Sequence, residues 1–180
     1  MQNGAYALNE FIKSYEDLFN KYNKVHNISR FKDIKNQAYD SISILEFVDF
    51  KDGSLIADIG SGAGFPAVFL AFVKKDCEFY LFEPNYKKAA FLNLIKINLS
   101  LPNIHICAKK VEDESLIKAD YITSRAFARA DIIIKLCENI CKKDCEFIFY
   151  KGSFLQNELD KIKNYKIYEK EQRKFLHIYK

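Results

Sequence analysis

The sequence lacks any apolar run long enough to cross a membrane, since the longest, Ala67–Val73, falls far short of the roughly 20 residues that a spanning helix needs. The N-terminus also lacks a basic segment followed by an apolar one, so no secretory signal is expected. No internal repeat or low-complexity linker interrupts the 180 residues, and their 49% apolar content supports a real core. These absences exclude a membrane partner and favour one globular unit.

No Cys-x-x-Cys pair occurs among the five cysteines, and their odd number argues against a disulfide framework. Reduced thiols and a cytoplasmic location are expected. Cys137, Cys141 and Cys145 are spaced by four residues, which would suit metal ligation if one helix carried all three. A strand is predicted from about Asp144, however, and no histidine lies near, so no metal site is predicted. The three histidines are scattered singly, and no role is assigned to them.

The most informative stretch runs from Leu55 to Pro66, where a short apolar strand gives way to three glycines within five residues. Gly60, Gly62 and Gly64 carry no Cβ, so a ligand can approach the bare backbone there. Asp58 stands near the end of the strand. The pattern predicts a strand, a glycine turn and a helix, with a ligand at the turn.

Two classes of cofactor compete for this turn. A second predicted strand, 77–82, ends at Glu83, about twenty residues beyond the glycines, where a carboxylate binds ribose hydroxyls in nucleotide-binding βαβ units. A dinucleotide site needs a further glycine where this chain has Phe65, and Pro66 withdraws a donor from the phosphate position. Asp58 would repel a pyrophosphate but suits an ammonium group. S-adenosylmethionine, which has an ammonium and no phosphate, is therefore favoured over a nicotinamide dinucleotide.

Apolar periodicity predicts strands and helices that alternate along most of the chain. Amphipathic helices are expected over 5–22 and 34–48, separated by a break at 23–27, and further helices over 66–74, 85–99 and 132–140. Strands are expected at 55–59, 77–82, 104–107, 120–124 and 146–152, followed by an antiparallel pair at 166–168 and 175–179. This order predicts an α/β fold: a doubly wound, mostly parallel sheet with C-terminal antiparallel strands and an N-terminal helical extension.

Two regions packed together as one unit are predicted: an N-terminal helical cap over 1–52 and a larger domain over 53–180. Ligands of doubly wound sheets bind at the carboxyl ends of the strands. Candidate polar groups follow four strands in succession at that edge: 58–65, Glu83, Val111-Glu112 and Ser124-Arg125. Their convergence predicts the site.

Several of these stretches resemble the RsmG (GidB) family over nearly the whole chain, from about Tyr15 onward. The matching segments are 57–66, Ser-Arg-Ala-Phe-Ala at 124–128, Lys-Gly at 151–152, Asn-Lys-Tyr-Asn-Lys at 20–24 and Asp-Ser at 40–41. The resemblance implies a class I, Rossmann-like methyltransferase that uses S-adenosylmethionine to methylate N7 of a guanine in bacterial 16S rRNA.

The resemblance also implies roles for particular residues. Gly60 and Phe65 match cofactor contacts, Val111 and Glu112 match contacts beside the adenine, and Arg125 matches the arginine of the Ser-Arg-Ala-Phe motif. Asp58, Gly62 and Glu83 complete the expected cofactor site by their chemistry, and Arg125 is the expected catalytic residue, joining cofactor and substrate. An ion pair with Glu112 or Asp58 is the structural alternative for Arg125. Where family members usually carry a histidine, this chain has Gln37.

The formal net charge of +4 permits a nucleic-acid partner, here 16S rRNA or the small ribosomal subunit, and a monomer is expected. Candidate RNA contacts around the mouth of the site are Lys24, Arg30, Arg129 and Lys151. Three other functions stay open: a small-molecule methyltransferase that uses the same cofactor, an rRNA-binding or assembly factor without catalysis, and a nicotinamide-dependent oxidoreductase, which Phe65 and Pro66 disfavour.

Overall fold

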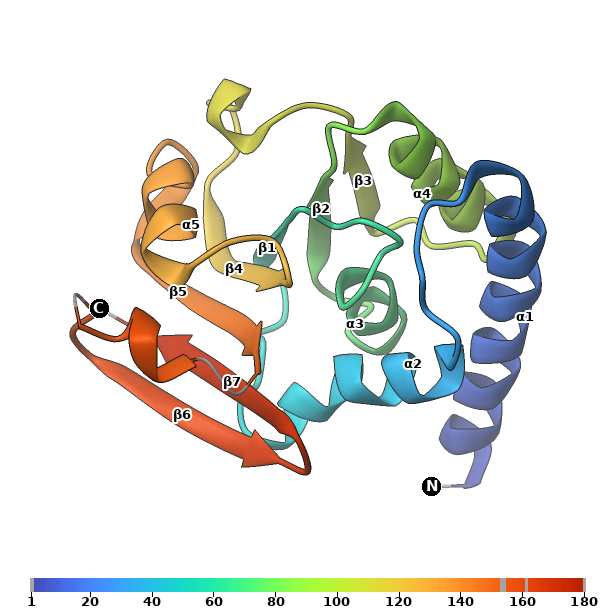
Figure 1. The fold of residues 1–180 in the computed structure, drawn as a ribbon, viewed down its shortest axis with the longest axis horizontal. Coiled ribbons are helices and arrows are strands. Elements are labelled where there is room, and N and C mark those ends of the chain that lie inside the picture. The colour runs from blue at the N-terminus through green and yellow to red at the C-terminus, as the bar shows by residue number, and fades with distance from the viewer. Residues whose placement is uncertain (1, 153–154, 161, 180) are drawn as a thin grey trace.

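A seven-stranded sheet organises the protein in a computed structural model that describes residues 2–152, 155–160 and 162–179 (Figure 1). The strands are β1 (Leu55–Ile59), β2 (Glu78–Phe82), β3 (Ile104–Cys107), β4 (Ala119–Arg125), β5 (Cys141–Lys151), β6 (Tyr165–Lys170) and β7 (Arg173–Ile178). Their order is β3-β2-β1-β4-β5-β7-β6; the first five pair in parallel, and β7 pairs antiparallel with β5 and β6. The predicted doubly wound sheet with a C-terminal antiparallel pair is confirmed.

Helices cover the two faces of the sheet unequally. They are α1 (Gln2–His26), α2 (Ile34–Ile42), α3 (Ala67–Val73), α4 (Tyr86–Asn98) and α5 (Ala130–Leu136), with 3-10 turns η1 (Ser43–Glu46), η2 (Val111–Asp113) and η3 (Leu155–Glu158). Neighbouring strand residues point to opposite faces, so Ile56 packs with residues of α1 to α4 while Ala57 packs with residues of α5. None of the described helices combines the length and the hydropathy needed to cross a bilayer.

The N-terminal helices share a core with the sheet. Tyr15 and Phe19 on α1 are fully buried. The ring centroid of Tyr15 lies 4.9 Å from that of Phe69 on α3, and the centroid of Phe19 lies 5.9 Å from that of Phe91 on α4. The aromatic side of α1 therefore packs on α3 and α4, the helices that follow β1 and β2.

The predicted break at 23–27 is wrong, because α1 continues to His26. Tertiary contacts hold its last turn: the Tyr22 hydroxyl donates to the carbonyl of Lys87 at 2.8 Å, and the Tyr22 ring packs on Phe91 at 5.2 Å between centroids. The helix ends at His26, and the next residue, Asn27, has a left-handed φ of 49°. The polar residues at 23–27 predict a helix end that lies too early in the chain.

The second predicted helix is shorter than expected, since α2 ends at Ile42 and a 3-10 turn follows. The hydroxyls of Ser41 and Ser43 donate to the carbonyls of Gln37 and Asp40 at 2.7 and 2.8 Å. Such side-chain bonds to the preceding turn compete with regular helix geometry. These two serine side chains therefore explain why α2 ends at Ile42.

The fifth strand is longer than expected, at the expense of the preceding helix. β5 begins at Cys141 rather than near 144, and α5 ends at Leu136 rather than at 140. Pairing with the neighbouring strand explains the difference, because Ala119 of β4 pairs with Cys141 and donates its N–H to the carbonyl of Ile140 at 2.6 Å. Long-range pairing overrides the local helical pattern.

Candidate cofactor and RNA site

The four predicted polar segments do meet at the carboxyl edge of the parallel strands. The loop 60–66 follows β1, Glu83 follows β2, η2 carries Val111 and Glu112 beyond β3, and Arg125 ends β4. The N–H groups of Gly60 and Ser61 both donate to the carbonyl of Phe82, at 3.0 and 3.2 Å, which ties the loop to β2. The topology therefore places these groups together as predicted.

The glycine loop is held in a backbone conformation that suits glycine. Gly60, Gly62 and Gly64 have φ values of 69°, 58° and 94°. A Cβ at Gly64 would approach the Val68 side chain to 2.5 Å, whereas at Gly62 the nearest atom would be 3.8 Å away. Gly64 is thus required for packing, and Gly62 leaves room beside the backbone.

Replacing Gly64 with alanine should lower the free energy of unfolding by about 2–4 kcal/mol, because left-handed strain and overpacking add. Gly62→Ala is the matched control: it carries the strain without the collision, so a loss of about 1–2 kcal/mol is expected. Urea denaturation of both variants measures the difference. Equal losses would show that the contact with Val68 relaxes freely.

Glu83 orders two segments of the site. It is 6% exposed, and its two carboxylate oxygens accept the backbone N–H groups of Gly62 and Asn85, each at 2.9 Å. The loop after β1 is thereby tied to the start of α4. Each carboxylate oxygen has a second lone pair, so the group can still accept from a ribose hydroxyl.

Asp58 is a buried carboxylate with one unsatisfied oxygen. Its Oδ1 accepts from the Thr123 hydroxyl at 2.7 Å, while Oδ2 has no hydrogen-bond partner in the part of the chain that the structure describes. Burial raises the pKa of Asp58 to about 7, against the opposing effect of hydrogen bonds from Ser61 and Thr123. A buried acceptor beside the glycine loop is a site for a cationic donor.

The Arg125 guanidinium has two hydrogen-bond partners and two aromatic neighbours. Its guanidinium donates to Asp40 and to Gln37, each at 2.8 Å, and lies 5.1 Å from the ring centroids of both Phe31 and Phe65. Burial lowers the pKa of Arg125, and the Asp40 carboxylate opposes this shift. Arg125 does form an ion pair, but its carboxylate partner is Asp40 rather than the Glu112 or Asp58 considered from the sequence.

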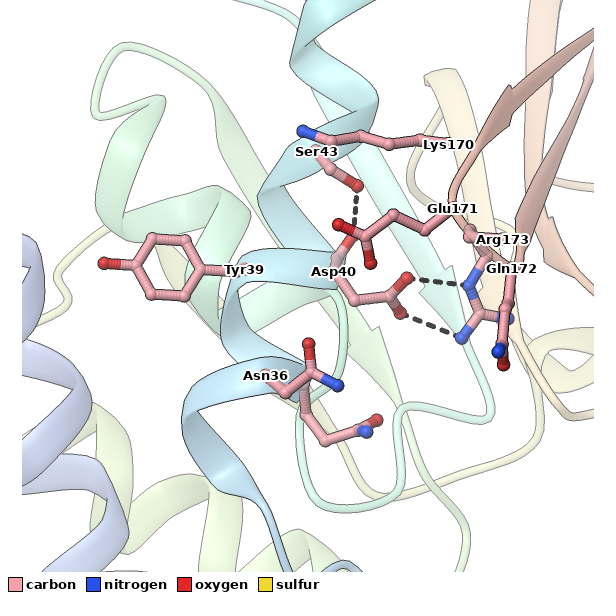
Figure 2. A pocket seen from close by; sticks show the side chains of 9 residues that line it. Asn36, Tyr39, Asp40, Ser43, Lys170, Glu171, Gln172 and Arg173 are labelled. Atoms are coloured by element: carbon pink, nitrogen blue, oxygen red, sulfur yellow. Dashed lines mark hydrogen bonds and ion pairs between the residues drawn. The ribbon is translucent and has the colours of Figure 1, made fainter.

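A polar cleft of about 730 Å³ lies between α2 and the turn that joins β6 to β7, and it is lined by Gln37 and Asp40, the two partners of Arg125 (Figure 2). Figure 2 shows Asp40 at the cleft with both carboxylate oxygens bonded to Arg173, at 2.8 Å to Nε and 2.9 Å to Nη2. Asp40 therefore links three segments: α2, the end of β4 through Arg125, and the start of β7.

Two buried tyrosines that sequence reasoning did not select also connect the N-terminal helices to the site. The Tyr15 hydroxyl donates to the carbonyl of Ala63 in the glycine loop, and the Tyr150 hydroxyl donates to the carbonyl of Ser41 on α2. In the sequence, Tyr15 forms part of the apolar stripe of a helix. The role of the Tyr15 hydroxyl is seen only in its tertiary contact with Ala63.

The other predicted residues differ in their surroundings. Val111 is buried in the core beside the site, and Glu112 is exposed. Among the candidate RNA contacts, Lys24, Arg30 and Arg129 are exposed. Lys151 instead makes contacts within the protein: it forms an ion pair with Glu158 at 2.7 Å and donates to the backbone carbonyl of Ala128 at 3.0 Å.

No histidine, cysteine and carboxylate cluster fit to hold a metal ion exists among the described residues. The three evenly spaced cysteines do not share a helix, since Cys137 follows α5 while Cys141 and Cys145 lie on β5. None of the five cysteines forms a disulfide.

The residues present fit S-adenosylmethionine. The unpartnered oxygen of Asp58 suits the ammonium of the ligand, and Gly62 leaves its backbone approachable. Glu83 retains acceptor capacity for a ribose. Pro66, which caps α3 directly after the glycine loop, has no N–H, so the start of this helix offers one donor fewer to a phosphate.

Comparison with known proteins agrees with this site. The family described as rRNA small subunit methyltransferase G matches residues 8–180. Ribosomal RNA small subunit methyltransferase G from Campylobacter jejuni is 47% identical and covers 92% of this chain and 88% of its own; the enzyme of that name from Campylobacter hominis is 42% identical and covers 93% and 90%.

Solved structures show the same fold at low identity. A SAM-dependent O-methyltransferase from Thermotoga maritima gives a TM-score of 0.67 at 15% identity, covering 88% of this chain and 70% of its own. A SAM-dependent methyltransferase from Aquifex aeolicus gives 0.65 at 15% identity, covering 88% and 97%. With the fold, the site and the sequence matches in agreement, the chain belongs to the rRNA small subunit methyltransferase G family.

Proposed function

We propose that this protein transfers a methyl group from S-adenosylmethionine to N7 of a guanine in the 16S rRNA of the small ribosomal subunit. The observation that carries the proposal is the buried, unpartnered Asp58 oxygen beside an approachable glycine loop, in a chain whose family methylates small-subunit rRNA. The action on rRNA implies a cytoplasmic location, and we expect the protein to work as a monomer.

Residues of four segments would hold the cofactor. The backbone of Gly60 and Gly62 would receive the methionine end, with Asp58 accepting from the ammonium. Glu83 would accept from the ribose hydroxyls. Phe65 and Val111 would pack beside the adenosine, and Glu112 would accept hydrogen bonds at the adenine. These residues follow β1, β2 and β3, so the cofactor would lie across the carboxyl edge of the sheet.

The reaction needs no basic side chain. N7 of guanine carries an available lone pair at neutral pH, so no proton has to be removed before it attacks. When bound, S-adenosylmethionine supplies a methyl group on a sulfonium centre: the N7 lone pair forms the new C–N bond as the S–C bond breaks and its electron pair returns to sulfur. Catalysis by the protein is therefore positioning and electrostatics.

Residues 1–52 would act as a cap that shapes the substrate side of the site. The cap contacts the glycine loop through Tyr15 and the end of β4 through Asp40 and Gln37. The family resemblance implies a histidine at position 37, whereas this chain has Gln37, whose side-chain oxygen accepts from Arg125. A protonated imidazole at this position is therefore not part of the proposed chemistry.

The experiment incubates the protein and labelled S-adenosylmethionine with small subunits from cells that lack this gene, and in parallel with naked rRNA and a mixture of metabolites. Label in 16S rRNA at N7 of one guanine supports the proposal. Label in metabolites alone would favour a small-molecule methyltransferase. Binding to subunits without transfer would favour an rRNA-binding factor.

Replacing Arg125 with alanine should lower kcat/KM on small subunits about a hundredfold, because the guanidinium packs against both Phe31 and Phe65 beside the glycine loop and their displacement misplaces the reactants. Steady-state kinetics together with calorimetric affinity for S-adenosylmethionine measure both effects. Unchanged turnover on intact subunits would rule out a catalytic role for Arg125.

A further inference from the structure

Phe127 is a large apolar side chain that stays 47% exposed at the carboxyl edge of the sheet. It comes two residues after Arg125, the last residue of β4. Between them, Ala126 has a φ of 55°, a left-handed conformation that is uncommon for residues other than glycine. The sharp bend of the chain and the exposed ring thus fall beside the proposed site.

The ring of Phe127 lies directly against the glycine loop. A Cβ built on Gly60 would come within 2.5 Å of Phe127 Cδ2 and 2.8 Å of Cγ. The ring therefore occupies the space that only a glycine leaves open, at the first glycine after β1. Phe127 therefore borders the loop that is proposed above to hold the methionine end of the cofactor.

A second exposed ring lies at the other end of the same loop. Phe31, 37% exposed, lies 5.2 Å from Phe65 in an edge-to-face arrangement, and one of its faces is taken by the Arg125 guanidinium. Figure 1 shows the loop after β1 running between the segment that joins α1 to α2 and the segment that follows β4. Phe31 belongs to the first of these segments, and Phe127 to the second.

The two rings differ in what they do for the fold. Phe31 packs on a ring and a cation, so it has a structural role. Phe127 stacks on no ring or cation in the part of the chain that the structure describes, and its ring lies against the backbone of Gly60. Half of its surface is left for another molecule.

A guanine in RNA offers the matching surface. An enzyme that modifies a base needs it out of its stack, and aromatic side chains replace the lost stacking, since every base has a π-face. We propose that Phe127 is the platform on which the target guanine stacks during methyl transfer. The proposal rests on the function proposed above and adds a substrate contact to it.

The test compares Phe127→Leu, which keeps apolar volume and loses the π-face, with Phe127→Trp, which enlarges it. Tyr6→Leu is the matched control, because Tyr6 is a 70% exposed ring near the start of α1. We expect Phe127→Leu to lower kcat/KM on small subunits about 10- to 100-fold. Phe127→Trp should stay within about threefold of the unchanged protein, and Tyr6→Leu within about twofold.

A second readout is independent of turnover. The chain contains no tryptophan, so Phe127→Trp introduces a single indole whose fluorescence reports on that position. Binding of small subunits in the presence of S-adenosylhomocysteine should quench it by stacking, whereas the indole of Tyr6→Trp should not change. Calorimetry should give Phe127→Leu an affinity for S-adenosylhomocysteine within about twofold of the unchanged protein.

Each outcome decides the matter. Full kcat/KM for Phe127→Leu, or unquenched indole fluorescence when sedimentation shows bound subunits, overturns the stacking proposal alone. A parallel loss of affinity for S-adenosylhomocysteine also overturns it, because Phe127 would then belong to the cofactor site. An unchanged protein that transfers no methyl group to subunits overturns the proposed function and, with it, this inference.

Discussion

Replacing Asp40 with alanine should lower the free energy of unfolding by about 3–5 kcal/mol, because it leaves two arginines without their shared carboxylate. Arg125 has a side chain only 5% exposed, and that of Asp40 is 17% exposed. A buried guanidinium that loses its counter-charge cannot recover the loss from water. Urea denaturation at neutral pH measures the change.

An exposed ion pair provides the control for Asp40. Lys174 and Glu169 pair at 3.0 Å across the β6–β7 hairpin, with side chains 40% and 60% exposed. Glu169→Ala should cost less than about 1 kcal/mol, because solvent screens such pairs. If Asp40→Ala costs no more than Glu169→Ala, the two arginines find other partners and the three-segment tie carries little stability.

The same variant should impair methyl transfer. Asp40 fixes the guanidinium that packs against both Phe31 and Phe65, so its removal should release both rings at the glycine loop. Asp40→Asn keeps one acceptor and loses the charge, and we expect it to fall between the alanine variant and the unchanged protein in both stability and kcat/KM. Asp40 is a positioning residue, since it acts through Arg125.

The sequence predicts the sheet well for a physical reason. Strands buried on both faces are nearly continuous apolar runs, and β1 and β2 stand out as such between polar turns. The glycine loop is equally local: its conformation needs glycines, and these are visible in the sequence. From these two features follow the α/β fold and the edge where the site lies.

Element ends and side-chain partners were beyond sequence reasoning because they depend on long-range contacts. The last turn of α1 is held by a contact between Tyr22 and Lys87, 65 positions later. Asp40 and Arg125 are separated by 85 positions, and the Asp40 pair with Arg173 by 133. Pairs so far apart in the chain produce no periodic pattern in the sequence. The sequence indicates that Arg125 can pair with a carboxylate, and the structure shows that this carboxylate is Asp40.

The affinity for S-adenosylmethionine should rise with pH between about 6 and 8, and Asp58 is the cause. Burial raises its pKa from 3.8 to about 7, so a large share of the molecules carry a protonated, neutral carboxyl at neutral pH. An ammonium beside Oδ2 favours the ionised form. Below pH 7 binding must first remove the proton, which costs up to about tenfold in affinity per pH unit.

Asp58→Asn should remove this pH dependence and weaken binding at pH 8 by about 10- to 100-fold, because a charge-assisted hydrogen bond is lost. Calorimetry with S-adenosylhomocysteine at pH 6, 7 and 8 measures both effects, and the unchanged protein should release protons on binding. Asp131→Asn, which alters a partly exposed carboxylate on α5, is the control and should leave the pH profile as it is. A flat profile for the unchanged protein would remove Asp58 from the ammonium site.

Stability without ligand should show the opposite trend with pH. The folded protein holds the Asp58 proton more tightly than the unfolded chain, so this group contributes its full stability below about pH 4 and loses it as pH rises to about 7. A shift of about three pKa units corresponds to on the order of 4 kcal/mol. Asp58→Asn should therefore be more stable than the unchanged protein at pH 8, and the two should converge toward pH 4. Such a variant, more stable yet poorer at binding, would show that the protein tolerates an unfavourable buried charge for the sake of its ligand.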